Sequence, residues 1–195
     1  MNLNGSKKTE EQDLNMSILP NIGVIEASDP ATYLITPFQN GDQAYLAFLG
    51  QATKKVRVMI YGFTLDDVVQ QFISQKAAGV DVKLIFDHSQ AEEHAERPEI
   101  QKLVAGGFKD GVDFLIGTSP KHHAINHLKA TWIDDEAVLH GSWNYSVSAD
   151  AEYNSIEIVR SPELARAFDQ VFSFAWRWIL QNEAVYNTVP ASPLT

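Results

Sequence analysis

The sequence contains no cysteine. This absence excludes disulfide bonds, thiolate zinc sites, iron–sulfur clusters and a cysteine nucleophile. It leaves the redox compartment open, because a chain without thiols is compatible with either environment. The sequence also lacks a hydrophobic run of the roughly 18 residues that span a bilayer, and its first residues lack the apolar segment of a signal peptide. We therefore expect a soluble protein without stable membrane insertion, either cytoplasmic or in a compartment that the sequence does not identify.

Basic residues are scarce. The chain has 15 lysines and arginines against 25 aspartates and glutamates, which gives a formal net charge of −10. A protein that coats nucleic acid has a broad basic face, and this balance argues against one. A small basic pocket is still compatible with the composition.

The length of 195 residues is typical of one domain with a real core. Residues 1–17 are polar and without periodicity, so we expect a flexible leader, and residues 187–195 resemble a loose tail. Between them, residues 18–186 are expected to form a single domain.

Strand-like and helix-like segments alternate along that domain. The expected strands are residues 32–38, 56–63, 80–86, 112–116, 127–133, 137–140 and 155–159. The expected helices are residues 43–52, 66–78, 99–105 and 162–180. This alternation predicts an α/β fold with a mixed, mostly parallel sheet flanked by helices. The sheet cannot be wholly parallel, because the two strands in residues 127–140 are joined by a tight acidic turn and form a hairpin.

Polar side chains gather around that hairpin. His127 and Lys129 are two residues apart on an expected strand and therefore share a face, while Leu128 is expected to point into apolar packing. Ser142 and Asn144 follow the second strand, where the chain turns back over the same face. Lysine and asparagine can stabilise phosphate oxygens, and histidine can attack phosphorus or move a proton. The cluster therefore indicates a phosphate site. Taken singly, His127 would favour a core histidine, and Asn144 is compatible with a cap on the turn after Gly141.

The same residues match the motif H-x-K-x4-D-x6-G-S-x-N without a gap, and this motif resembles that of the phospholipase D superfamily. It falls on the following positions: His127, Lys129, Asp134, Gly141, Ser142 and Asn144. The resemblance extends over most of residues 32–180 and implies that family's α-β-α sandwich. Only one copy of the motif is present, as in the small, Nuc-type bacterial endonucleases of the superfamily.

The resemblance implies a phosphodiesterase that works through a covalent phosphohistidine, without a metal or cofactor. Because the family's chemistry needs two motifs, it also implies a homodimer with the active site at the interface. His127 would be the nucleophile or the acid, Lys129 and Asn144 the phosphate ligands, and Ser142 a supporting donor. Glu152 corresponds to a family glutamate that orients the histidine, although the alignment there shifts by a residue or so. Asp134 and Gly141 are expected to organise the hairpin.

Several alternatives accompany this interpretation. His122 and His123 could join His127 in a metal site, but no suitably spaced carboxylate accompanies them, and a loop at the mouth of the site is favoured. His88 and His140 are expected in a loop and in packing, respectively. We expect foremost an endonuclease acting on DNA, steered by local lysines in spite of the net charge. A phospholipase D acting on phospholipid head groups is the second hypothesis, and a non-catalytic phosphate-binding module is the third.

Overall fold

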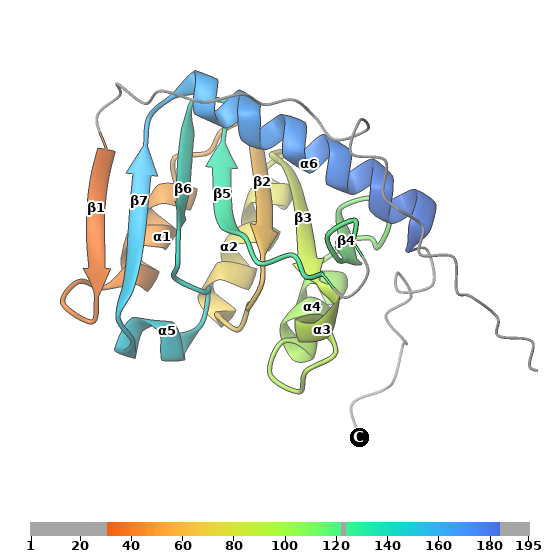
Figure 1. Cartoon of the computed structure of the whole chain (residues 1–195), viewed down its shortest axis with the longest axis horizontal. Coiled ribbons are helices and arrows are strands. Elements are labelled where there is room, and N and C mark those ends of the chain that lie inside the picture. The colour runs from red at the N-terminus through yellow and green to blue at the C-terminus, as the bar shows by residue number, and fades with distance from the viewer. Residues whose placement is uncertain (1–30, 122–123, 184–195) are drawn as a thin grey trace, which may run out of the picture.

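The computed structural model describes residues 31–121 and 124–183. These residues form one seven-stranded sheet in the order β1-β7-β6-β5-β2-β3-β4 (Figure 1). The strands are β1 (Ala31–Thr36), β2 (Lys55–Ile60), β3 (Asp81–Asp87), β4 (Phe114–Gly117), β5 (Lys129–Ile133), β6 (Ala137–Gly141) and β7 (Asn154–Val159). The helices are α1 (Gly41–Leu49), α2 (Asp66–Ala77), α3 (His88–Ala91), α4 (Arg97–Ala105), α5 (Val147–Ala151) and α6 (Pro162–Asn182). The expected leader and tail lie outside the described residues, and so do the expected ends of the domain.

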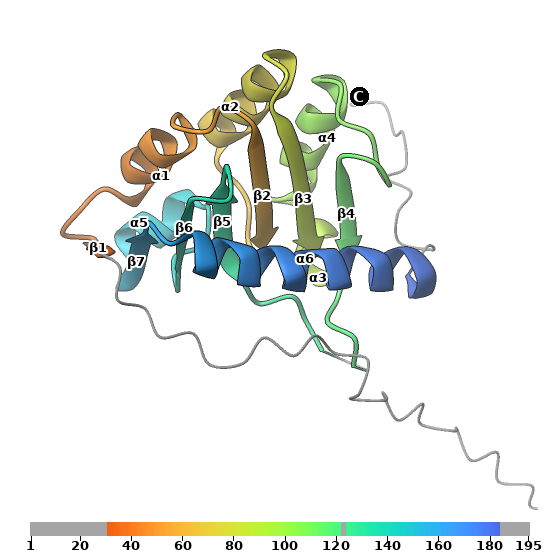
Figure 2. The same ribbon diagram turned by 90° about the horizontal axis from the view of Figure 1, so that it is seen from above.

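Helices cover both faces of the sheet, which confirms the predicted α/β sandwich. Figure 2 shows α6 on one side and α1, α2 and α4 on the other. Each face has its own apolar core because the central strands alternate buried side chains between the two sides. Val58 and Leu84 pack toward α1, α2 and α4, whereas Met59 and Trp132 pack against α6. No helix in the described part of the chain is both long and apolar enough to cross a membrane.

The sheet is mixed, as predicted, but the expectation that most of its strand pairs are parallel is wrong. Only β2–β3 and β3–β4 pair in parallel, whereas β1–β7, β7–β6, β6–β5 and β5–β2 pair antiparallel. The β–helix–β connections occur in the half that contains β2, β3 and β4, and they bring consecutive strands into parallel register. The second half is built on the β5–β6 hairpin, and each strand added to it reverses direction.

The segment around His127 also differs from its prediction. The strand begins at Lys129, and residues 124–128 form an irregular segment before it. Leu128 is 37% exposed rather than packed inward. The cause is Asn126, which is buried and whose side-chain amide donates to the carbonyls of Ile60 and Ile85 at 3.4 and 3.3 Å. These bonds tie the segment to the ends of β2 and β3, so it does not continue the β5 ladder. The short helices α3 and α5 were not predicted.

Asp134 fixes the turn between β5 and β6. Its carboxylate accepts hydrogen bonds of 2.7 to 2.9 Å from the backbone N–H groups of residues 53–55 and from the Thr53 hydroxyl. Burial of the carboxyl acts to raise its pKa, but these bonds stabilise the charged form and lower the pKa overall. Stability from this group is therefore present above the ordinary aspartate pKa and lost as the pH falls through the lowered value. The turn is at the opposite end of β5 from Lys129.

Replacement of Asp134 by asparagine tests this anchor. We expect Asp134→Asn to lower the free energy of unfolding by about 2 kcal/mol or more, because a charged acceptor of several hydrogen bonds is lost. Urea denaturation measures the change. Asp135→Asn is the matched control, because Asp135 has the same left-handed backbone as Asp134. Its carboxylate, however, is half-exposed and pairs with Lys55. The control substitution should change stability by less than about 0.5 kcal/mol. Equal effects of the two substitutions would contradict the anchor.

Candidate active site

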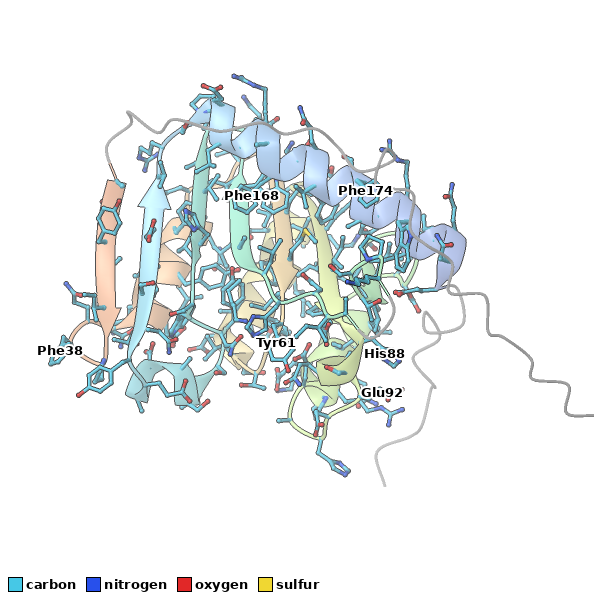
Figure 3. The ribbon with its side chains drawn as sticks, viewed as in Figure 1. Phe38, Tyr61, His88, Glu92, Phe168 and Phe174 are labelled. Carbon is cyan, nitrogen blue, oxygen red and sulfur yellow. The ribbon has the colours of Figure 1, made fainter. Side chains whose placement is uncertain are left out.

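Four strand ends converge on one edge of the sheet. The strands β2 and β3 are parallel and end there, whereas β5 runs antiparallel to β2 and begins there. The strand β6 runs antiparallel to β5 and also ends there. Tyr61, which follows β2, and His88, which follows β3, both lie at this edge (Figure 3). The topology therefore brings the start of β5 and the end of β6, which precede and follow the hairpin of the motif, next to the ends of β2 and β3.

The ring of Tyr61 contacts the side chains of both His127 and Lys129. Its ring is 4.7 Å from the centre of the His127 imidazole, in an edge-to-face arrangement. The Lys129 ammonium lies over the same ring, 4.7 Å from its centre, and donates to the His127 carbonyl at 3.0 Å. His127 is exposed, whereas Lys129 is only 5% exposed. An open imidazole thus lies beside an almost buried cation.

Burial also changes the ionisation of Lys129. Desolvation lowers its pKa to about 8, and the negative charge of Asp87 acts in the opposite direction. The ammonium form therefore predominates at pH 7 and is lost as the pH rises through about 8. Because burial excludes water from this cation, its interaction with an anionic ligand is stronger than that of an exposed lysine.

Asp87 holds the segment that carries His127. It is fully buried at the end of β3, and one carboxylate oxygen accepts from the Asn126 N–H at 2.7 Å. The other oxygen accepts from the Ser89 N–H at 2.9 Å and from its hydroxyl at 2.5 Å. The position of His127 is therefore set through the residue before it, by a carboxylate at the end of β3, which is separated from β5 by β2.

The loop after β6 brings Asn144 to the same edge. Gly141 is required there, because it has a φ of +151° and a Cβ atom would come within 2.1 Å of the Ser155 carbonyl oxygen. The Ser142 hydroxyl donates to the Asn154 amide oxygen at 2.9 Å and accepts from the Ser155 N–H at 3.0 Å. The Asn144 side chain lies against Gly62 and makes no hydrogen bond within the described residues, and its amide oxygen is buried. Ser142 thus fixes the loop, and the Asn144 side-chain amide is left without a hydrogen-bond partner among the described residues.

Glu152 lies apart from this group. It is exposed at the end of α5, where its carboxylate is 3.5 Å from the Asn154 side-chain nitrogen. Through Asn154 it is connected to Ser142, and no contact to His127 is found among the described residues. The other carboxylate of this segment, Glu157, faces His140 across β7 and β6 at 3.8 Å. The orienting role expected for Glu152 therefore stays a prediction.

Of the three histidines considered together for a metal site, the structure describes His127 alone. His122 and His123 lie outside the described residues. Within residues 31–121 and 124–183, no group of three or more histidine and carboxylate side chains is arranged to hold a metal ion. His140 packs against Phe168 on the α6 face, with ring centres 5.9 Å apart. His88 pairs with Glu92 one helical turn further on, at 3.5 Å.

Sequence analysis missed two residues of the site, Tyr61 and Asp87. Both lie at the carboxyl end of a buried strand, and in parallel sheets such positions form ligand sites. That placement is the signal that could have identified them. What the sequence does not reveal is that β5 enters next to β2, which brings Lys129 opposite Ile60 and next to Tyr61.

Most of the domain matches a single protein family. Residues 45–176 match the family model described as "Cardiolipin synthase, PLD-like domain". A mitochondrial cardiolipin hydrolase of Chlamydomonas reinhardtii is 29% identical over 133 residues, which are 68% of this chain and 56% of that protein. A phospholipase D of Rickettsia bellii is 24% identical over 152 residues, 77% of this chain and 70% of that protein. The chain thus spans little more than half the length of the Chlamydomonas protein.

Solved structures show the same fold. The phospholipase D family member Nuc from Salmonella typhimurium superimposes with a TM-score of 0.64 at 22% identity, over 76% of this chain and 95% of that one. NucT from Helicobacter pylori superimposes with a TM-score of 0.63 at 18% identity, over 76% and 96% of the two chains.

The pKa of Lys129 predicts a pH-dependent affinity for anions at this edge. Sulfate keeps its charge between pH 6 and 10, so its binding reports on the protein. We expect the affinity to fall by about tenfold or more between pH 7 and pH 9.5, as the ammonium deprotonates. Isothermal titration calorimetry measures the affinity, and Lys129→Met should bind weakly at every pH. A wild-type affinity that is constant with pH would contradict the role of Lys129.

Proposed function

The chain belongs to the family of phospholipase D-like domains, and from this premise we propose that it is a phosphodiesterase that needs no metal and forms a covalent phosphohistidine. The observation that carries the proposal is the contact of both His127 and Lys129 with Tyr61, beside an Asn144 amide without a hydrogen bond. This arrangement offers a nucleophile, a cation and a neutral donor to one phosphate group.

The reaction has two steps. In the first, a nitrogen of His127 forms a bond to phosphorus, the bond from phosphorus to the leaving oxygen breaks, and a second histidine gives that oxygen its proton. In the second, the same histidine takes a proton from water, the water oxygen bonds to phosphorus, and the bond from phosphorus to His127 breaks. Lys129 and Asn144 stabilise the oxygens on which negative charge grows, and Ser142 holds the loop that carries Asn144.

A second copy of the chain supplies the second histidine in this proposal. The sequence contains a single motif, and the His127 side chain is exposed and makes no hydrogen bond to another described residue. A twofold axis near this edge brings the two imidazoles to opposite sides of one phosphate. Light scattering after size-exclusion chromatography tests the dimer, and a monomer that turns over substrate contradicts it.

DNA is the first proposed substrate, on the grounds of the resemblance to single-motif endonucleases. The net charge of −10 makes attraction to DNA depend on local cations such as Lys129 and predicts strong dependence on salt.

Phospholipid is the second proposed substrate, and one structural observation favours it. Ile125 and Leu128, which flank His127, are 41% and 37% exposed. Apolar side chains beside a phosphate site suit the glycerolipid part of a substrate, and the names of the Chlamydomonas and Rickettsia relatives refer to lipids.

Cleavage in excess EDTA tests the proposed chemistry and separates the substrates. Wild type should hydrolyse a phosphodiester without added metal, either in single- or double-stranded DNA or in vesicles that contain cardiolipin. His127→Ala should lose activity on the same substrate by more than about a thousandfold, because the nucleophile and the acid are lost together. Residual activity within about tenfold of wild type would contradict the assignment. Product release from only one of the two substrates identifies the substrate class.

A further inference from the structure

A buried carboxyl group lies behind the candidate site. Glu96 is only 2% exposed and directly precedes α4. Its side chain does not cap α4, although it occupies the capping position. Instead, one oxygen accepts from the backbone N–H of Phe63 at 2.9 Å, and the other is buried with no hydrogen bond to any described residue. The carboxyl is thus directed at the segment that follows β2.

That segment, residues 61–63, is the part of the site that the motif residues contact. Tyr61 contacts both His127 and Lys129, and Gly62 lies against the Asn144 side chain. Backbone bonds hold the segment from the opposite direction, because the Gly62 carbonyl accepts from Tyr145 at 3.0 Å and the Tyr145 carbonyl accepts from Thr64 at 2.7 Å. The hydrogen bond from the Phe63 N–H to Glu96 also holds this segment, and its acceptor is a side chain rather than the backbone.

We propose that Glu96 is a positioning residue for the proposed reaction, which fixes residues 61–63 so that the Tyr61 ring holds His127 and Lys129 in their relative places. The inference rests on the proposed function for its effect on turnover. It concerns a residue outside the motif, directly before a helix from which no side chain belongs to the candidate site described above.

The surroundings of Glu96 favour its neutral form. Desolvation raises its pKa to about 8, the bond from Phe63 acts to lower it, and the carboxylate of Asp87 acts to raise it further. Because this value lies above the ordinary value of 4.5, the native state binds the extra proton. Its contribution to stability is therefore complete below that ordinary value and declines as the pH rises through about 8. A neutral acid keeps the contact to Phe63 without a second buried charge beside Asp87.

Three substitutions test the proposal. Glu96→Ala removes the acceptor for the Phe63 N–H, whereas Glu96→Gln keeps an acceptor oxygen and cannot ionise. Glu99→Gln is the matched control, since Glu99 is 8% exposed on the first turn of α4 and pairs with Lys102 at 2.9 Å. Urea denaturation establishes that each variant is folded under the conditions used.

Turnover and the His127 NMR signal are measured on each variant, and the pH dependence of stability on Glu96→Gln. The first is hydrolysis of bis(4-nitrophenyl) phosphate in EDTA, in which kcat should fall between about tenfold and a hundredfold for Glu96→Ala. It should stay within about twofold of wild type for Glu96→Gln and Glu99→Gln. The second is the proton NMR signal of the His127 imidazole, assigned by its loss in His127→Ala. The adjacent Tyr61 ring shifts this signal, so Glu96→Ala should move it and the other two variants should not. Glu96→Gln should also flatten the decline of stability between pH 5 and pH 8.

Each outcome bears on a different claim. A folded Glu96→Ala variant with wild-type kcat and an unmoved His127 signal overturns the positioning role. A Glu96→Gln variant as impaired as Glu96→Ala overturns it as well, because the acceptor is then not what matters. A wild-type protein that does not hydrolyse the diester speaks against the proposed function, and the His127 signal still decides on Glu96.

Discussion

The site depends on an ammonium group held almost out of water at the edge of a sheet. Lys129 is the first residue of β5, pairs with Ile60 at the end of β2, and rests on the ring of Tyr61. A lysine in this position is stabilised by the aromatic face, the His127 carbonyl and the charge of Asp87, and each of these comes from a different segment. The antiparallel entry of β5 beside β2 is therefore the constraint from which the rest of the site follows. A parallel neighbour would place Lys129 at the opposite edge.

The sequence predicts the placement of His127, Lys129 and Asn144 near one end of the hairpin better than it predicts the pairing of the strands. The residues of the motif are close together in the chain, so the hairpin of β5 and β6 alone brings His127, Lys129 and Asn144 to one edge. Their partners are distant in sequence. Asp87 reaches the segment before His127 through the Asn126 N–H, and Glu96 reaches Phe63 across 33 residues. No local pattern specifies such contacts, because they depend on which strands become neighbours.

The direction of the strands illustrates the same point. The alternating strand and helix patterns in the first half correspond to β2, β3 and β4, which pair in parallel, as β–helix–β connections favour. They do not predict that β1 pairs with β7 at the far edge, because that pairing joins residues more than a hundred positions apart. The irregular segment before Lys129 is also invisible to periodicity, since alternation of polar and apolar residues continues through Leu128 while the backbone follows Asn126 to the ends of two other strands.

The proposed chemistry requires that His127 becomes covalently bonded to phosphorus during turnover. Rapid quenching during hydrolysis of a ³²P-labelled diester tests it most directly, followed by mapping of the label under alkaline conditions, which preserve phosphohistidine. We expect label to accumulate on a peptide containing His127 in the wild type and to be absent from His127→Ala. Turnover by the wild type with no labelled protein at any time, or label on a peptide without His127, would contradict it.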